Sequence, residues 1–587
     1  MNIICIVVFI FTFISCNYSF SVYKKSEHQI AESESVLDPN GELTIKWLVD
    51  YSIRKIRFQI CLSEKAPAMN WFALGFSDRG DLENADLCIV WTDYNEVDHF
   101  EDMHSDKEGK LIRDSKQNCD AFHINAKSRS ITFERYFDTC DNDDYLIEDG
   151  TVHVIWARGT DKLFSSKGLC LPCTSSHDHG FIRVRLLTPP GIPIENAQKL
   201  AITNKNLKVP NSDTTYWCKV VKLPDFVTNN IHHIIKFESA ITKGNEGLVH
   251  HMEVFYCDAE PQIEIPLYEG NCFAPDRPES TKLCSKVKAA WAMGAPPFVY
   301  PNEAGLPLGG KQANKYVMLE VHYNNPQLKD DWVDSSGITL HLTANRRQYD
   351  AAIMELGLEY TDKMAIPGGQ KAFPLTGYCI PQCTGVGLPT QGIIVFGSQL
   401  HTHLTGVAVW TRHFRRGIEL PILNKDVHYS THFQEIRILR RPVTVLPGDY
   451  LMTTCLYNSL DKYNATIGGH AITDEMCVNY MHYYTASELE VCKSSISNAA
   501  LEKYFKFEKR WDNMPISYKE SPRANYLAIK PWTPLRANSL KLLYNESPIS
   551  MQCNKSDGNR FQGFWEGIQI PKIKLPLTPE PRNCPQK

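Results

Sequence analysis

Cysteine is the residue that most constrains how this chain can fold. The chain contains 19 cysteines, and only Cys5 and Cys16 lie in the apolar stretch at the N-terminus. The other 17 are scattered without the paired spacing of a zinc finger. Such usage is typical of a disulfide framework built in an oxidising compartment. An odd number leaves at least one free thiol or one interchain bridge, so the sequence allows a homo-oligomer.

The N-terminus predicts entry into the secretory pathway. The apolar stretch from Ile3 to Cys16 suits the core of a signal peptide and is short for a membrane span. We therefore expect residues 1–20 to be a signal peptide, or an uncleaved signal that anchors part of the protein to a membrane. Three Asn-x-Ser/Thr sequons fit a glycosylated protein. These sequons lie at Asn464, Asn545 and Asn554.

The composition excludes one class of partner. Hydrophobic residues make up 43% of the chain and charged residues 22%, which is the balance of an ordinary globular protein. The formal net charge is -5, so the chain as a whole lacks the basic footprint of nucleic-acid binding. We therefore expect no nucleic-acid partner.

The sequence predicts mainly β structure. From residue 42 to 158, short runs rich in β-branched and aromatic residues alternate with Gly, Asp and Asn clusters, which is the pattern of a β-sandwich. Residues 159–213 are rich in Pro, Gly, Ser and Asn and are predicted to be a linker. The β pattern resumes over 214–515, a length that suits two further domains. A short helix is expected over 501–511, and the Pro-rich tail, 516–587, is expected to be held to the body by disulfides.

Histidines gather on or beside the predicted strands of 214–515. In "GSQLHTHLTG", His401 and His403 lie two residues apart, so in a strand both imidazoles point to one face. His250 and His251 are adjacent in "LVHHMEVFYC" and need a β-bulge or a strand end to act together. His322 lies opposite the apolar face of "YVMLEVHYNN". A lone strand histidine is usually a surface or satisfied residue, but together these residues indicate a metal.

The histidines alone do not select the metal. Imidazole suits zinc, copper, iron and nickel, and three histidines also suit a zinc site with an open position. A thioether ligand would favour copper, because soft sulfur prefers the reduced copper ion. Met476, in "TDEMCVNYMHYY", is the candidate thioether, although methionine more often fills gaps in a core.

Several stretches carry a family resemblance. They are "DTTYWC", "TKGNEGLVHHMEVF", "YVMLEVHYNNP", "IMELGLEY", "QLHTHLTG", "HFQEIR" and "DEMCVNYMHYY", with "SDRGDLENADL" and "YLIEDGTVHV" nearer the N-terminus. Over roughly residues 40–500 the chain resembles the copper type II, ascorbate-dependent monooxygenases. Within that family it is most similar to the branch that hydroxylates phenylethylamines.

The resemblance implies a fold with an N-terminal DOMON-like β-sandwich, two jelly-roll-like copper domains and a disulfide-tethered C-terminal tail. The first copper domain would span 214–355 and the second 356–515. Each would bind one copper, with ascorbate as electron donor. By position, the ligands of the electron-storing copper would be His250, His251 and His322, and those of the oxygen-activating copper would be His401, His403 and Met476.

The implied activity is hydroxylation of a benzylic β-carbon with O2. The substrate would be dopamine, giving noradrenaline, or tyramine, giving octopamine, in catecholamine or octopamine biosynthesis. The sequence does not separate the two amines, which differ by one ring hydroxyl. Because the amine and ascorbate must meet, a secretory vesicle is the expected destination, with the extracellular space as the alternative.

The resemblance also points to residues beyond the copper ligands. It implies a catalytic role for Tyr216 and His401, and for Tyr216 the alternative is a buried structural tyrosine beside a disulfide. It places Glu355 and Tyr483 near the substrate pocket. A buried Glu355 needs a cationic partner. That partner is either the substrate ammonium or a neighbouring Lys or Arg.

The resemblance further implies six disulfides. They would be Cys140–Cys584, Cys218–Cys272, Cys257–Cys284, Cys379–Cys492, Cys383–Cys553 and Cys455–Cys477. Left without partners are Cys61, Cys88, Cys119, Cys170 and Cys173. The interchain cysteines expected soon after the core are absent between residues 493 and 552, which puts a covalent dimer by that route in doubt.

Two alternatives compete with the amine hydroxylase. A peptidylglycine α-hydroxylating monooxygenase would share the two-copper core, but that branch normally lacks the DOMON-like domain. A secreted copper-binding protein without catalysis is the other alternative, and the complete set of six ligands argues against it.

Overall fold

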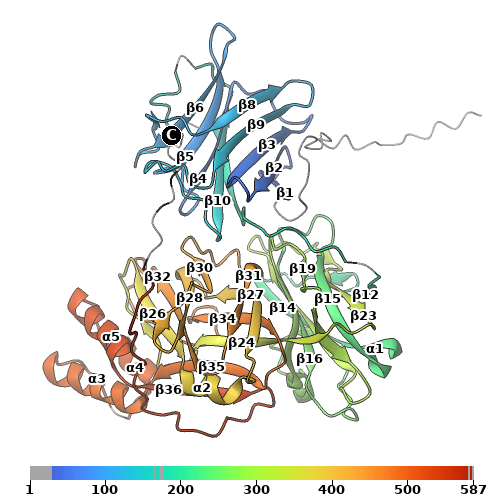
Figure 1. The fold of residues 1–587 in the computed structure, drawn as a ribbon, viewed down its shortest axis with the longest axis vertical. Helices are drawn as coiled ribbons and strands as arrows, with labels where there is room; N and C mark the ends of the chain where they lie inside the picture. The colour runs from blue at the N-terminus through green and yellow to red at the C-terminus, as the bar shows by residue number, and fades with distance from the viewer. Residues whose placement is uncertain are drawn as a thin grey trace, which may run out of the picture. The chain divides into compact units, whose positions relative to one another are not determined.

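The computed structural model describes residues 30–163, 165–171, 177–194, 196–517, 519–578, 582 and 584, which form two compact units. The first unit comprises the described residues up to Glu148, Val152–Pro190 and the C-terminal residues from Arg582. The second comprises Asp149–Thr151 and Gly191–Pro581. Both consist mainly of β-strands, which confirms the predicted fold class (Figure 1). The predicted signal lies outside the described residues. Within them, no helix combines the length and the apolar character that a membrane crossing requires.

The first unit is a two-sheet β-sandwich. Its five-stranded sheet has the order β1-β2-β3-β9-β8, and its six-stranded sheet has the order β11-β10-β4-β5-β6-β7. Along β2, buried side chains alternate with half-buried ones, so one face of the sheet lies on the core. Phe58 of β3 and Phe76 of β4 meet there, with ring centroids 5.7 Å apart. The strands are β1 Ile30–Val36, β2 Leu43–Asp50, β3 Lys55–Leu62, β4 Trp71–Ser77, β5 Asp86–Thr92, β6 Asp98–Ser105, β7 Leu111–Arg113, β8 Asp120–Asn125, β9 Ser130–Tyr136, β10 Val152–Gly159 and β11 His177–Val184.

This sandwich is longer than the predicted span of 42–158. Strand β1 adds an edge to one sheet, and β11, inside the predicted linker 159–213, adds an edge to the other. Both strands are rich in polar residues ("IAESESV" and "HDHGFIRV"). Edge strands tolerate such sequences because one side of their backbone is unpaired, so they lack the hydrophobic signal of a central strand.

One eleven-stranded sheet runs through both predicted copper domains of the second unit. Its main path is β12-β23-β15-β20-β24-β34-β27-β31, with β19, β35 and β36 paired at its sides. The predicted domain boundary at 355/356 falls inside β24, which pairs in parallel with β20. These strands are β12 Gln198–Thr203, β15 Ile231–Ala240, β19 Phe298–Val299, β20 Ala304–Gly309, β23 Gly337–Thr343, β24 Tyr349–Leu358, β27 Ile393–His401, β31 Arg437–Val445, β34 Val478–Tyr484, β35 Leu489–Ile496 and β36 Ile549–Lys555.

Two five-stranded sheets and two short ribbons complete the β structure of this unit. The sheet β17-β14-β21-β16-β18 lies in the first predicted copper domain, and β26-β32-β28-β29, with β30 on β28, lies in the second. Their strands are β14 Thr214–Lys222, β16 Val249–Cys257, β17 Glu269–Asn271, β18 Cys284–Ala292, β21 Tyr316–Asn324, β26 Phe373–Cys379, β28 Gly406–Arg415, β29 Ile418–Glu419, β30 Asn424–Asp426 and β32 Asp449–Tyr457. The ribbons pair β13 Leu207–Lys208 with β22 Val333–Asp334, and β25 Ala365–Ile366 with β33 Thr466–Ile467.

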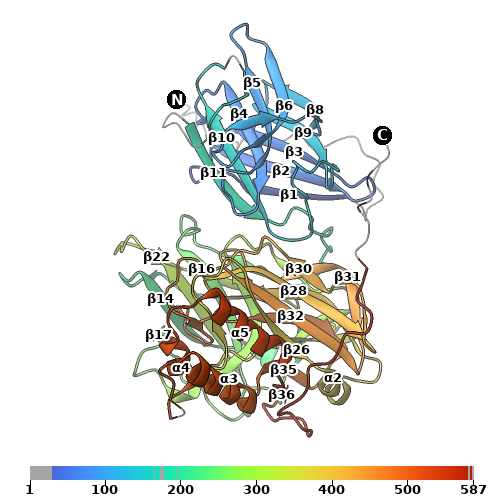
Figure 2. The same cartoon turned by 90° about the vertical axis from the view of Figure 1, so that its left-hand side faces the viewer.

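The tail is more ordered than predicted. It contributes α4 and α5 and the strand β36, and it follows α3, which contains the predicted helix 501–511. The three helices lie together beside β26 (Figures 1 and 2). Each begins at a Ser or Thr whose side chain accepts an N–H of the first turn, and α4 and α5 have Pro in that turn. The helices are α1 Asp225–Asn229, α2 Pro381–Gly387, α3 Asn498–Trp511, α4 Pro522–Ala528 and α5 Pro534–Glu546, and a 3-10 turn spans Glu279–Leu283.

The structure contains the six disulfides that the resemblance implied. The bonded pairs are Cys140–Cys584, Cys218–Cys272, Cys257–Cys284, Cys379–Cys492, Cys383–Cys553 and Cys455–Cys477. A seventh bond joins Cys88 and Cys119, which the sequence left unassigned. Cys61 and Cys170 are also disulfide-bonded, whereas Cys173 lies outside the described residues. The bond at Cys553 holds β36, and therefore the tail, to α2.

Candidate metal centres

His250, His251 and His322 meet on neighbouring strands β16 and β21. His251 lies directly opposite His322, and the register shifts between Val249 and His251, which makes His250 the extra residue of a β-bulge. This is the irregularity that two adjacent histidines need in order to act together. The Nδ1 atom of His251 lies 3.1 Å from that of His250 and 3.2 Å from that of His322. Three imidazole nitrogens therefore converge on one point.

This first set is suited to a cation. Burial lowers the pKa of His322 to about 4, with a further contribution from His250. Burial also lowers the pKa of His251 well below its usual value, and His322, His250 and His401 add to the effect. Of two facing neutral imidazole nitrogens at most one can carry a proton, so the other presents its lone pair. A bound metal ion would satisfy all three nitrogens at once.

Aromatic and acidic side chains surround the first set. The ring of Tyr216 stacks on that of His322, with centroids 4.4 Å apart and planes within 4° of parallel. Glu253 and Glu320 face each other across β16 and β21. Burial, reinforced by Glu320, raises the pKa of Glu253 to about 8. The carboxyl group nearest His251 in sequence is therefore mainly neutral at neutral pH.

His401 and His403 meet at the end of β27 rather than within it. The strand ends at His401, so the two histidines do not share one strand face as predicted, yet their rings lie 5.3 Å apart at 85°. The Nδ1 atom of His401 lies 2.6 Å from Gln434 Oε1, and that of His403 lies 3.0 Å from the carbonyl oxygen of Asp474. Both partners are acceptors, so each Nδ1 carries the proton and each Nε2 keeps its lone pair for a metal.

A buried carboxylate holds the backbone of this second set. Glu475 accepts the backbone N–H groups of His403 at 2.9 Å, Met476 at 3.1 Å and Thr405 at 2.6 Å. It also accepts the Thr405 hydroxyl at 2.8 Å. Burial raises the pKa of Glu475, and these hydrogen bonds oppose that rise. Four donors and no acceptor around its oxygens fit the ionised form. Glu475 thereby fixes the segments that carry His403 and the candidate thioether Met476, which is buried.

The two sets lie within electrostatic reach of each other. A charge on His401 contributes to lowering the pKa of His251. His432, which follows β30 in the second predicted copper domain, lies beside the first set, with its ring centroid 6.3 Å from that of His250. Burial lowers the pKa of His401 to about 4, with a further contribution from His403. Burial therefore keeps His251 and His401 available as neutral ligands at neutral pH.

The structure gives Glu355 a partner within the chain. Its Oε2 accepts from Lys493 Nζ at 2.5 Å and from the Tyr360 hydroxyl at 3.3 Å. Lys493 is buried. Burial is the largest single influence and lowers its pKa, but the charges and hydrogen bonds of Glu355 and Tyr360 together outweigh it, so the pKa of Lys493 is raised overall. Glu355 is half-buried, and the ion pair gives it a cationic partner, which is the second of the two alternatives left open by the sequence.

Tyr480, rather than Tyr483, shares a face with His401. On β34, Tyr483 points into a core cluster with Met481 and is almost fully buried. Tyr480, three residues earlier, lies on the opposite face, with its ring 6.2 Å from that of His401. The sequence resemblance did not single out Tyr480, and only the pairing of β27 with β34 reveals its position.

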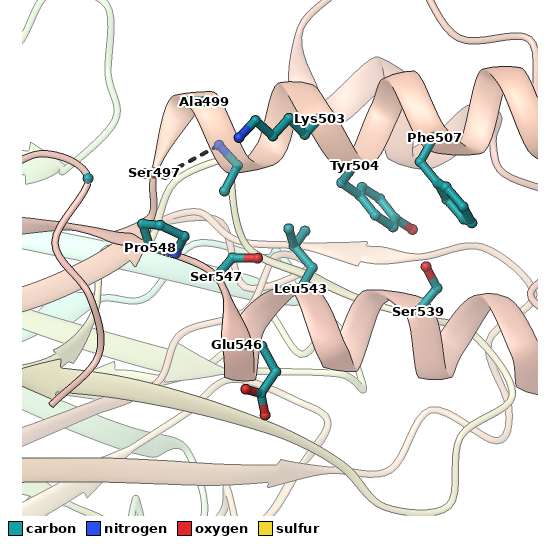
Figure 3. Close-up of a pocket in the computed structure, with 12 residues that line it drawn as sticks. Ser497, Ala499, Lys503, Tyr504, Phe507, Ser539, Leu543, Glu546, Ser547 and Pro548 are labelled. Atoms are coloured by element: carbon teal, nitrogen blue, oxygen red, sulfur yellow. Dashed lines mark hydrogen bonds between the residues drawn. The ribbon is translucent and has the colours of Figure 1, made fainter. Parts of the chain in front are cut away.

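Neither of two cavities in the described residues is lined by a candidate ligand. One, of about 490 Å³, lies between α3 and α5, where Tyr504 and Phe507 face Ser539 and Leu543 (Figure 3). Another, of about 390 Å³, is lined by Asp474 and Glu475 among others. None of the six candidate ligands lines either cavity. The second cavity borders the second set, because Leu404 and Glu475, the chain neighbours of His403 and Met476, line it.

Comparison with known proteins relates all three regions to one family. Residues 200–330 match the N-terminal domain of copper type II ascorbate-dependent monooxygenases, residues 349–505 match their C-terminal domain, and residues 39–159 match the DOMON domain. The chain is 44% identical to dopamine beta-hydroxylase of Homo sapiens, over 94% of this chain and 88% of that protein. It is 39% identical to tyramine beta-hydroxylase of Caenorhabditis briggsae, over 91% of each. It is 30% identical to DBH-like monooxygenase protein 1 of Homo sapiens, over 94% of this chain and 90% of that protein.

Proposed function

The chain belongs to the copper type II ascorbate-dependent monooxygenase family, and on that premise we propose that it hydroxylates the benzylic β-carbon of dopamine or tyramine. Family membership makes it an enzyme whose chemistry involves copper, ascorbate, O2 and a small organic substrate. The substrate proposal is supported by the names of two relatives, which state dopamine in one case and tyramine in the other.

The observation that carries the proposal is the difference between the two donor sets. His250, His251 and His322 offer three nitrogens that converge. His401 and His403 offer two nitrogens, beside a methionine held by the same carboxylate as His403. We propose that each set binds one copper ion and that Met476 supplies the sulfur ligand. Bound copper would supply one-electron transfer and O2 chemistry, for which a mixed imidazole and thioether set is suited.

The residues of the second set are prepared for this role by their hydrogen bonds. Gln434 and the carbonyl group of Asp474 hold the protonated Nδ1 atoms of His401 and His403. The rings are therefore oriented before a metal binds, which lowers the cost of assembling the centre. Glu475 fixes the backbone at His403 and Met476.

We propose that the substrate ring lies beside Tyr480. This side chain is only partly buried and shares the face of His401. Burial and the charges of Glu355, Tyr360 and Glu253 raise the pKa of Tyr480 well above its usual value. Its hydroxyl therefore stays protonated and can donate a hydrogen bond to a substrate. Because Glu355 is neutralised by Lys493, we do not assign the substrate ammonium to Glu355.

We propose that the enzyme works in the lumen of the secretory pathway, in a vesicle or after release. The disulfides support this location, because such bonds persist in oxidising compartments. Two of the predicted glycosylation sites, Asn464 and Asn545, are exposed, whereas Asn554 is half-buried in β36. We therefore expect glycans at Asn464 and Asn545 before Asn554.

The test is an assay of the purified, copper-loaded protein with both amines. We expect formation of octopamine from tyramine or noradrenaline from dopamine, dependent on O2, ascorbate and copper. Copper analysis should find two ions per chain. Absence of hydroxylated product from either amine in a protein that holds both ions would contradict the proposal. The ratio of kcat/KM for the two amines would then identify the preferred substrate.

A further inference from the structure

One loop of the second unit contacts both candidate centres. This loop, residues 429–434, lies between β30 and β31 and is called the 429–434 loop below. At the second centre, Tyr429 accepts the N–H of Thr402 at 2.9 Å, and Gln434 donates from Nε2 to the carbonyl of Thr402 at 3.3 Å. Thr402 is the residue between His401 and His403. The loop therefore binds both backbone groups of Thr402 and, through Gln434 Oε1, the ring of His401.

The same loop lies against the first centre. Phe433 is 4% exposed and packs on Gly294, where an added Cβ would lie 3.4 Å from the phenyl ring. The turn that contains Gly294 is fixed to the first centre, because the N–H of Met293 donates to the carbonyl of His250 at 2.9 Å. His432 places its imidazole edge-on to that of His250 at 83°. Phe433 thus docks the loop on a turn that is bonded to a candidate copper ligand.

The loop is short and internally fixed between these two contacts. The N–H of Phe433 donates to the carbonyl of Ser430 at 3.0 Å, and the N–H of His432 donates to the Ser430 hydroxyl at 3.3 Å. Only Phe433 separates His432, at the first centre, from Gln434, at the second. A displacement of the loop at one centre therefore also displaces the loop residue that contacts the other centre.

Resting on the proposed two-copper function, we propose that the 429–434 loop sets the position of one copper centre relative to the other. Phe433 is the positioning residue, because it seats the loop on the first centre. His432 and Gln434 are its two ends, each acting on one centre. Electron transfer between two centres depends on their separation and orientation. Displacement of the loop should therefore slow turnover without removing either metal.

Three single substitutions separate these roles in the cupric protein. His432→Leu should change only the electron paramagnetic resonance signal of the first centre, and Gln434→Leu only that of the second. Phe433→Ala should retain two copper ions and both local signals. It should instead change the dipolar coupling between the two ions, because it frees the loop from Gly294. Its kcat should fall roughly ten- to a hundred-fold, since small displacements of positioned groups cost rates of this order.

Matched variants exclude a general loss of packing. Phe433→Leu keeps an apolar side chain on Gly294 and should restore most of the dipolar coupling and of kcat. Phe58→Ala removes a fully buried phenyl group from the core of the first unit, on β3, and should leave the coupling unchanged. A Phe433→Ala protein with two coppers and an unchanged dipolar coupling would overturn the loop proposal. A wild-type protein with fewer than two coppers would instead refute the proposed function on which it rests.

Discussion

The histidines of the two candidate centres are supported in different ways. In the first, the imidazoles contact one another, and the ring of Tyr216 packs on them. In the second, each imidazole is hydrogen-bonded through Nδ1 to another part of the chain, and a carboxylate holds the backbone. The first set therefore relies on packing and on the metal itself, whereas the second is oriented in advance. The centre expected to handle O2 is the one whose geometry the protein fixes more completely.

Removal of the thioether should have the largest effect and should act on the second centre alone. Met476→Leu nearly conserves volume, so the fold should lose less than about 1.5 kcal/mol. Turnover should fall at least about a hundred-fold, because even outer partners of a metal site cost up to that much. Activity assays, copper analysis and circular dichroism would measure this. Met481→Leu is the control, because Met481 lies in a core cluster on β34, the strand that follows Met476. Near-normal turnover in Met476→Leu would contradict the proposal that the second centre differs from the first by a sulfur ligand.

Loss of the central carboxylate should test the support of the second centre. In Glu475→Gln an amide group faces backbone donors, and the stability should fall by about 2–4 kcal/mol because N–H groups lose their acceptor. The matched variant at the first centre is Glu253→Gln. It should be nearly neutral for stability, since burial raises the pKa of Glu253 to about 8 and the carboxyl group is already mostly uncharged at neutral pH. Chemical denaturation at neutral pH would compare the two. Equal losses would show that both centres depend on carboxylates alike.

The acidic residue opposite Tyr480 should be structural. Glu355→Gln leaves the buried Lys493 without its counter-charge, so stability should fall. The double variant Glu355→Gln/Lys493→Met should recover most of it. The KM for an amine and for a neutral phenylethyl analogue should change by similar small factors, within about threefold or 0.7 kcal/mol. A selective rise of KM for the amine would instead show that Glu355 interacts with the substrate ammonium.

The smallest effect is expected at Tyr216, whose ring stacks on His322 at the first centre. Tyr216→Phe keeps the ring stacked on His322, so kcat should change by less than about threefold, or 0.7 kcal/mol of barrier. Tyr216→Ala removes the stack and should weaken copper binding at the first centre more than at the second. Copper titration and steady-state kinetics would distinguish the two. A loss of more than tenfold in Tyr216→Phe would show that the hydroxyl takes part in catalysis.

Sequence reasoning predicted the histidines that the fold brings together, but not the residues that support them. The alternation along "YVMLEVHYNN" placed His322 opposite the apolar face, and the need for a bulge at His250 followed from strand geometry. Gln434 lies 33 residues from His401, and no local pattern links an amide side chain to a ring so far along the chain. Glu475 precedes Met476, but its role depends on the approach of the segment at His403.

The assignment of Tyr483 illustrates the same limit within one strand. Tyr480 and Tyr483 are three residues apart, so a strand must place them on opposite faces. The pairing of β34 with β27 decides which face of β34 lies next to His401, and the sequence of neither strand alone predicts that register. By contrast, the helices of the tail carry local signals in the sequence: Ser521 and Thr533 each precede a proline and accept an N–H of the first turn.

The Cys140–Cys584 bond turns most of the polypeptide into a covalent ring. Its two sulfur atoms belong to residues 444 positions apart, and both lie in the first unit, so the second unit is carried entirely within the ring. A protease that cuts once between the units opens the ring but releases nothing. The two halves separate only after a second cut or after reduction. This closure makes a single nick in the connecting segments tolerable for the integrity of the whole molecule.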